Sequence, residues 1–323
     1  MVFSIMPRGH KPINIIIKDH VIRFVELKTV SPISVLKKGE RYLPDGLIKE
    51  GRIIDQETLL MILEECIQDW GIKKRKIRFV VPDSFVVIRK VDVPTDLADE
   101  EIHGYLQFEL GSSIHLPFED PILDFEVVEV SEEKKSVLLF ASPEEVIQEY
   151  VEMFQELRLK AIAADISPLS LYRLYYIMDQ AATDERLLLV QYDQKSVNFS
   201  IFEEYKPIFM RHLVLDNPSK LWRVEEGKYT YLGDPVELKS QMNDTYKEIE
   251  RILSFYRFSL NQGRKQVTKI VVTGDHPKIR EITGDLQERV EVPIAPLVMS
   301  RALREHDLTD GFQLAVGLAL KEV

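Results

Sequence analysis

Residues 13–27 read INIIIKDHVIRFVEL, and this stretch decides the fold class. Two runs rich in β-branched residues, 13–17 and 21–27, flank the polar tripeptide at 18–20. β-Branched residues favour strands, and a short polar segment between two such runs is typical of a tight turn. The sequence therefore predicts a β-hairpin near the start of the chain.

The elements after this hairpin extend it into an α/β unit. A third short strand is expected at residues 33–36, and Asp55 is a good N-cap for a helix that Gly71 would end. Apolar residues between Asp55 and Gly71 recur at helical spacing, and residues 77–81 have the composition of a buried strand. The predicted order is therefore strand, strand, strand, helix, strand.

The same order of elements returns after residue 186. Three strands, a long helix and a further strand are expected at residues 187–192, 197–202, 207–213, 235–260 and 267–273. No sequence repeat accompanies them, so the repetition is one of architecture. A repeated order of strands and helices indicates two similar α/β halves.

We expect the whole chain to divide into five parts. Residues 84–165 mix strands and helices in an order that neither half requires, so we interpret them as an α+β subdomain inserted into the first half. We expect a first domain at 1–83, the insert at 84–165, a connecting helix of the first domain at 166–185, a second domain at 186–310 and an amphipathic C-terminal helix at 311–323.

Composition excludes several classes of protein. The 323 residues are 45% hydrophobic, which is enough for a folded core, and their net charge of −11 argues against a nucleic-acid partner. Cys66 is the single cysteine, so no internal disulfide forms. No apolar run is long enough for a membrane helix, and Pro7, Arg8 and His10 interrupt any signal sequence, so we expect a cytoplasmic protein.

The sequence contains no motif of a familiar catalytic or metal site. Its seven histidines lack the spacing of a zinc site, and P-loop, Gly-x-Ser-x-Gly and Gly-x-Gly-x-x-Gly motifs are absent. We therefore expect no metal site and no catalytic residue. The basic run KKRK at 73–76, with Arg78, has two interpretations: contact with anionic lipid, or a solvated loop after a helix.

Four stretches of the chain, in the same order and spacing, resemble one family. They lie at residues 46–55, 79–94, 108–125 and 247–274, and they include FVVPDS at 79–84, IRKVDVP at 88–94 and VTG at 272–274. In these stretches the chain resembles the PilM family of actin-like pilus assembly proteins, relatives of the cell-division protein FtsA. The resemblance covers nearly the whole chain, and it implies an α/β, actin-like (ribonuclease H-like) fold of two domains.

The resemblance also implies a partner and a place of action. PilM proteins belong to type IV pilus machines, and they stay at the inner face of the cell membrane by gripping the short cytoplasmic N-terminal tail of the membrane protein PilN. Family members often bind ATP in the cleft between the two domains. Within the insert, Leu116, Pro117 and Phe118 form an apolar, proline-containing loop that either lines a groove for such a tail or packs against its own domain.

The two phosphate-binding turns of the family are altered in this chain. Actin-like folds use one Asp-x-Gly turn in each half, because glycine lets the backbone approach the phosphates and aspartate reaches the metal. Alignment of residues 22–27 with the family puts Ile16 at the first Asp position and Lys18 at its Gly position. In the second half, Gln191 takes the Asp position and Asp193 the Gly position.

The adenosine side of the site and the helical cap are altered as well. The family's Thr-Gly-Gly motif ends here in Gly274 and Asp275, and residues 215–236 are too few for the usual helical subdomain. A carboxylate at Asp193 or Asp275 would repel phosphate. We therefore expect a reduced second domain, no ATP hydrolysis, and no bound ATP or Mg²⁺. The alternative is a shifted register in which Asp19 or Asp193 serves the metal.

These observations favour a non-enzymatic scaffold that recruits the cytoplasmic tail of a PilN-like single-span membrane protein. An active actin-like ATPase and an FtsA-like protein that self-associates into filaments are the two alternatives. The altered phosphate turns speak against the ATPase. The lack of an amphipathic membrane anchor at the C-terminal end speaks against the filament-forming protein.

Overall fold

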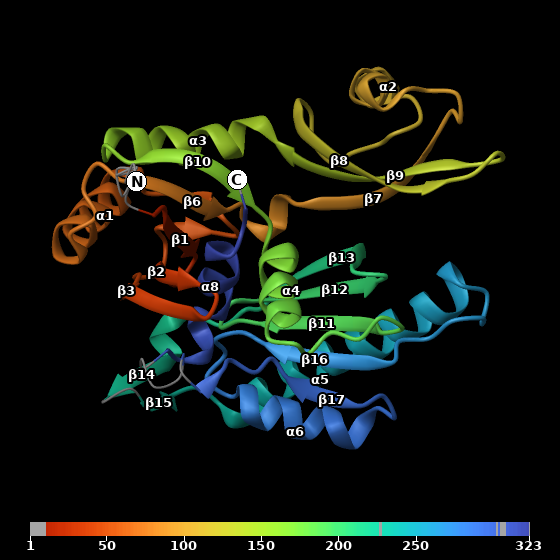
Figure 1. Cartoon of the computed structure of the whole chain (residues 1–323). Coiled ribbons are helices and arrows are strands. Elements are labelled where there is room, and N and C mark those ends of the chain that lie inside the picture. Colours follow the sequence, from red (N-terminus) through yellow and green to blue (C-terminus); the bar gives the residue numbers. More distant parts are fainter. Residues whose placement is uncertain (1–10, 226–227, 302, 304–307, 323) are drawn as a thin grey trace, which may run out of the picture.

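The computed structural model describes residues 11–225, 228–301, 303 and 308–322. Two five-stranded sheets carry helices on their faces, and a smaller three-stranded sheet stands at one side of them (Figure 1). The expectation that rests on Pro7, Arg8 and His10 concerns residues outside this description.

The first sheet has the strand order β10-β6-β1-β2-β3. Its strands are β1 (Ile13–Lys18), β2 (Val21–Val30), β3 (Ile33–Tyr42), β6 (Lys76–Val80) and β10 (Lys160–Asp165). β1 pairs antiparallel with β2, which is the predicted hairpin, and parallel with β6, and β6 pairs parallel with β10. Helices α1 (Gln56–Trp70) and α3 (Glu144–Glu156) bury their apolar faces on one side of this sheet.

The second sheet repeats this topology with the order β13-β12-β11-β16-β17. Its strands are β11 (Arg186–Tyr192), β12 (Ser196–Glu203), β13 (Lys206–Val214), β16 (Lys269–Thr273) and β17 (Ile294–Pro296). Helix α5 (Pro235–Ser254), its π-helical continuation η4 (Phe255–Leu260) and helix α6 (Ile279–Arg289) pack on its outer face. Because strand order and strand directions match those of the first sheet, the predicted pair of similar α/β halves is confirmed.

Two helices lie between the sheets and join them into one core. They are α4 (Ser167–Ile177) and α8 (Gln313–Ala319). A Cβ at Gly317 would lie 2.0 Å from the carbonyl oxygen of Ser170, so glycine lets α8 approach α4. Every residue of α8 is buried, and the expectation of an amphipathic helix at this position is therefore wrong. Both sheets and α4 enclose the helix, which leaves it no solvent-facing side.

The insert is a three-stranded antiparallel sheet with one helix on its face. Its elements are β7 (Val87–Val93), α2 (Ile102–Glu109), β8 (Pro121–Val130) and β9 (Lys135–Pro143), with the strand order β7-β9-β8. The predicted end of the insert at residue 165 is wrong, because α3 and β10 belong to the first domain, where β10 pairs with β6. The local sequence of a strand does not show which sheet the strand joins, so the sequence alone does not fix this boundary.

A short hairpin lies between β13 and α5, in the region that the sequence analysis finds too short for a helical subdomain. Between β13 and α5 the described residues form the turn η3 (Ser219–Leu221) and the strands β14 (Trp222–Glu225) and β15 (Lys228–Tyr231). The other short elements are β4 (Ile48–Lys49), β5 (Arg52–Ile53) and the turns η1 (Asp83–Phe85), η2 (Asp99–Glu101) and η5 (Asp310–Phe312). Within the described ranges, no helix is long and apolar enough to cross a membrane.

Candidate functional site

The two altered turns face each other across the cleft between the domains. The first follows β1, which ends at Lys18, and the second follows β11 and contains Asp193. Lys18 Nζ lies 2.6 Å from Asp193 Oδ2 and 4.0 Å from Asp275 Oδ2. Lys18 and Asp193, the two residues that align with the glycines of the Asp-x-Gly turns, therefore form an ion pair with each other.

Asp275 contacts two further side chains of the first domain, those of His20 and Arg23. His20 Nε2 lies 3.0 Å from Asp275 Oδ2, and the Arg23 guanidinium donates to the same oxygen. These three side chains are at most 5% exposed. Burial by itself would raise the pKa of Asp275, but His20, Lys18 and Arg23 outweigh it and hold that pKa well below its usual value. Asp275 is therefore an ionised carboxylate inside the protein, and its charge is balanced by the first domain.

Hydrogen bonds within the second domain hold both carboxylates in place. The backbone N–H of Asp275 donates to Asp193 Oδ1 at 3.2 Å, and that of Gln194 donates to Asp275 Oδ1 at 3.1 Å. The side chain of Gln191 donates to Asp193 Oδ2 at 2.6 Å. Gln191, Asp193 and Asp275 thus form one hydrogen-bonded unit.

Gly274 and His276 fix the loop after β16 against the end of β11. Gly274 has φ +123°, and a Cβ there would lie 2.1 Å from the carbonyl oxygen of Tyr192, so the close approach requires glycine. The His276 ring packs between Tyr192 and Trp222, with centroids 5.0 and 5.7 Å away. Burial lowers the pKa of His276 to about 4, so this imidazole is neutral at pH 7.

Ile16 and Asp19, the other two predicted positions, serve the first domain itself. Ile16 is buried in the core between the sheets, so an apolar side chain stands where the family has its first aspartate. Asp19 accepts hydrogen bonds from the backbone N–H groups of Glu50 at 2.6 Å and Gly51 at 3.0 Å. Both carboxylate oxygens of Asp19 therefore hold the turn between β4 and β5.

A third carboxylate, the half-buried Asp83, lies at the same cleft. It accepts hydrogen bonds from the Ser167 hydroxyl and, at 2.6 Å, from the side-chain amide of Asn198. The oxygen of that amide lies 2.6 Å from His212 Nδ1. Burial raises the pKa of Asp83, and its hydrogen bonds link the first domain to β12 and, through Asn198, to β13.

The side chains leave little room between the turns. The cavity there has a volume of about 60 Å³, whereas pockets that bind small molecules have about 300–1,000 Å³. A wider hollow of about 660 Å³ opens at the rim beside Lys49, Lys195 and Lys220, and one of about 330 Å³ adjoins Gly274 on the side of α6. No group of three or more His, Cys, Asp or Glu side chains in the described part of the chain is placed to hold a metal ion.

The two other sequence features lie away from the cleft. Leu116 packs against the core of the insert, Pro117 is exposed and Phe118 is half-buried. The basic run does not form one surface, because Arg75 pairs with Glu26 and Arg78 donates to a carbonyl of α8.

Sequence reasoning missed His20, Arg23 and Asp83. One signal is present for Arg23: together with Glu26 it interrupts the apolar residues of the strand at 21–27. A charged side chain in a buried strand needs a partner of opposite charge, because an unpaired buried charge is costly. The partner, Asp275, is 252 residues away in the chain, and no local pattern indicates it.

Comparisons with known proteins agree with this architecture. The model of the family described as type IV pilus assembly protein PilM matches residues 15–216. Among solved structures, a PilM–PilN type IV pilus biogenesis complex is similar over 97% of this chain and 98% of that chain, with 19% identity and a TM-score of 0.77.

Two more distant structures share the fold. The ethanolamine utilization protein EutJ from Carboxydothermus hydrogenoformans matches over 98% of this chain and 90% of its own, with 9% identity and a TM-score of 0.53. The cytoplasmic domain of EpsL, an inner-membrane component of the type II secretion system of Vibrio cholerae, matches over 95% and 94%, with 9% identity and a TM-score of 0.50. The predicted actin-like fold of two domains is confirmed. Since the family model spans well over half of the chain, this protein belongs to the PilM family of type IV pilus assembly proteins.

Proposed function

We propose that this protein is a non-enzymatic adaptor of a type IV pilus machine. It binds the cytoplasmic N-terminal tail of a PilN-like single-span membrane protein, and that partner keeps it at the inner face of the membrane. The partner class is supported by the similar structure of a PilM–PilN complex. The scaffold role is supported by the arrangement of charges in the cleft.

The Lys18–Asp193 ion pair is the observation that carries the non-enzymatic part of the proposal. A triphosphate with Mg²⁺ would have to displace Lys18 and meet the carboxylates of Asp193 and Asp275, which repel phosphate. Breaking a buried ion pair costs about 3–5 kcal/mol, whereas a ligand with a millimolar Kd gains only about 4 kcal/mol on binding. The cost therefore cancels a weak nucleotide affinity.

The rim hollow is the observation that favours the alternative, a nucleotide-binding protein. Its volume of about 660 Å³ is sufficient for a small ligand, and Lys49 and Lys220 line it. Lys195, the third lysine there, is already paired with Asp45 across the cleft. A nucleotide bound at this rim would lie outside the two turns. Substitution of Lys49 and Lys220 by glutamate would then weaken nucleotide binding, whereas substitution of Lys18 would not.

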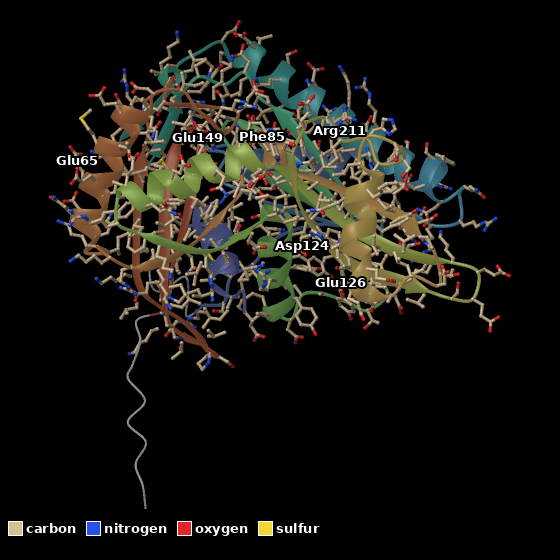
Figure 2. The ribbon with its side chains drawn as sticks, turned by 90° about the horizontal axis from the view of Figure 1, so that it is seen from above. Glu65, Phe85, Asp124, Glu126, Glu149 and Arg211 are labelled. Carbon is tan, nitrogen blue, oxygen red and sulfur yellow. The ribbon has the colours of Figure 1, made fainter. Side chains whose placement is uncertain are left out.

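The free edge of the insert offers a place for an extended tail. β8 is the outer strand of the order β7-β9-β8, and nothing in the described residues pairs with its outer side. Its half-buried residues Leu123, Phe125 and Val127 pack on the core of the insert, and Asp124 and Glu126 alternate with them and are exposed. Figure 2 labels these two carboxylates on the insert.

This edge sets the chemistry of the tail that fits it. An added strand pairs with the β8 backbone, and its successive side chains point to opposite faces of the sheet. Apolar residues at alternate positions of the tail would extend the row formed by Leu123 and Phe125. Leu116 packs against the same core of the insert. Lysine or arginine residues between them would face Asp124 and Glu126.

A peptide titration tests the proposal. A fluorescent peptide copies the cytoplasmic tail of the single-span membrane protein encoded beside this chain, and its anisotropy is followed as the full-length protein is added. We expect saturable binding that 5 mM Mg-ATP, about five times a millimolar Kd, leaves unchanged, and that serine substitution of the tail's leucines or isoleucines abolishes.

The variant Asp124→Lys/Glu126→Lys locates the contact. It should weaken binding of the tail at least tenfold, whereas the control Glu65→Lys, at a 62% exposed position on α1, should not. Absence of saturable binding would overturn the adaptor function. Equal binding by both variants would retain the adaptor but reject β8 as its contact.

A further inference from the structure

A basic and apolar tip ends the long helix of the second domain. Between Glu250 and Asp275 the chain has five lysine or arginine residues and no acidic residue. The chain as a whole has a net charge of −11, so this stretch is opposite in sign to the rest of the molecule. We call residues 255–265, which comprise η4 and the turn after it, the tip; in Figure 1 the helical end of α5 projects at the right margin of the second domain.

The tip exposes three large apolar side chains on a fixed turn. Phe258 is 60% exposed, Leu260 47% and Phe255 39%. The turn is held from inside by Tyr256, which is buried and donates its hydroxyl to Glu203 at 2.9 Å. The apolar side chains are therefore presented by an anchored backbone and not by a loose loop.

The charges beside these side chains are cationic. The Arg257 guanidinium lies 5.0 Å from the centroid of the Phe258 ring. Arg257 and Arg264 are exposed, and neither has a carboxylate partner among the described residues, whereas Arg251 and Lys265 are paired. The tip therefore carries a net positive charge next to exposed aromatic surface.

We propose that the tip binds the surface of an anionic phospholipid membrane. Arginines attract anionic headgroups, and exposed Phe and Leu side chains enter the boundary between headgroups and acyl chains. The strong negative charge elsewhere confines the contact to this tip and so fixes which side of the molecule faces the membrane. The inference rests on the tip alone and does not depend on the proposed tail binding.

An exposed aromatic ring elsewhere on the molecule is not accompanied by positive charge as it is at the tip. Phe108 on α2 is 81% exposed, more than any large apolar side chain of the tip, but the same helical segment begins with Asp99, Glu100 and Glu101. An anionic surface would repel that region. Phe108 is therefore the matched control for the apolar part of the contact.

Vesicle flotation with the full-length protein tests the proposal in the absence of any partner. We expect the protein to float with vesicles of phosphatidylcholine and phosphatidylglycerol in a 7:3 ratio, an anionic content chosen to give a strongly negative surface. It should not float with phosphatidylcholine alone, and 0.5 M NaCl, at which charges are screened beyond about 4 Å, should reduce binding at least tenfold.

Two variants and two controls decide the outcome. Arg257→Glu/Arg264→Glu should lose at least tenfold in binding and Phe258→Ser/Leu260→Ser at least fivefold. The controls Lys73→Glu/Lys74→Glu, in the other basic stretch, and Phe108→Ser should stay within twofold of the wild type. Absence of binding to the anionic vesicles, equal binding by all variants, or retention only by vesicles that carry an acidic protein would overturn the proposal.

Discussion

The two turns that meet in the cleft have opposite charges. The turn of the first domain and the strand after it supply Lys18, His20 and Arg23, whereas the second domain supplies Asp193 and Asp275. Glu40 of the first domain also pairs with Arg23, and the contact between the domains adds the ion pairs of Lys18 with Asp193 and of Arg23 with Asp275. The comparison teaches that ion pairs between the two domains balance the charges that line this cleft.

Removing Asp275 would break this balance most strongly. Asp275→Ala leaves His20 and Arg23 buried without their shared carboxylate, and we expect the free energy of unfolding to fall by about 3–5 kcal/mol. Urea denaturation of the variant and the wild type measures the difference. The exposed Asp69→Ala on α1 is the control and should leave stability unchanged. A loss no greater than that of the control would show that the two turns do not depend on each other.

The pH dependence of protein stability tests the second domain's side of the comparison at His276, the residue after Asp275. Its folded-state pKa is about 4, below the ordinary value of 6.5, so the unfolded chain takes up a proton in this window and the folded chain does not. Stability is therefore complete above pH 6.5 and falls as the pH drops towards 4, by about 3 kcal/mol from this group.

Urea denaturation of the wild type and His276→Asn between pH 7 and pH 4 measures this contribution. Asparagine keeps an acceptor for the backbone N–H of Lys278, which His276 Nδ1 now accepts at 3.1 Å. The variant should lose less stability over this range than the wild type. Identical pH profiles would show that His276 is not held neutral, and that the second domain contributes a cation of its own to the cleft.

A double-mutant cycle on Lys18 and Asp193 tests the contact itself, with a smaller expected effect. Lys18→Met and Asp193→Asn should each destabilise the protein, and the double variant should be less destabilised than their sum by about 1–3 kcal/mol. The pair Lys195 and Asp45 at the rim is the control: Asp45 is 39% exposed, so its coupling should be at most about 1 kcal/mol. Additive effects at Lys18 and Asp193 would mean that their contact does not join the domains.

The sequence predicts the repeated sheets because their strands carry strong local signals. The β-branched runs at residues 13–17 and 21–27 become β1 and β2, and the second set of runs becomes β11, β12 and β13. The residues of β10 fall within the range 84–165 that the sequence analysis assigns to the insert. Pairing between β10 and β6 is a tertiary choice that a strand's own residues do not encode.

The candidate site was predicted only in part for the same reason. Alignment with the family located Lys18, Gln191, Asp193 and Asp275, and the structure brings these side chains together. From sequence alone, the carboxylates of Asp193 and Asp275 are expected to repel phosphate. The sequence does not show that Lys18, which lies beside both of them, reaches them from the other domain. The contact forms only when both domains are folded and docked, which is beyond the reach of local spacing.

Titration of the wild-type protein with Mg-ATP in a calorimeter tests the internal charge balance most directly. At millimolar nucleotide, a binding free energy of about 4 kcal/mol would still be detected. We predict no saturable heat, because Lys18 already occupies the place between Asp193 and Asp275 where phosphate and metal would bind. Saturable binding with a micromolar Kd that is altered in Lys18→Met would contradict this account.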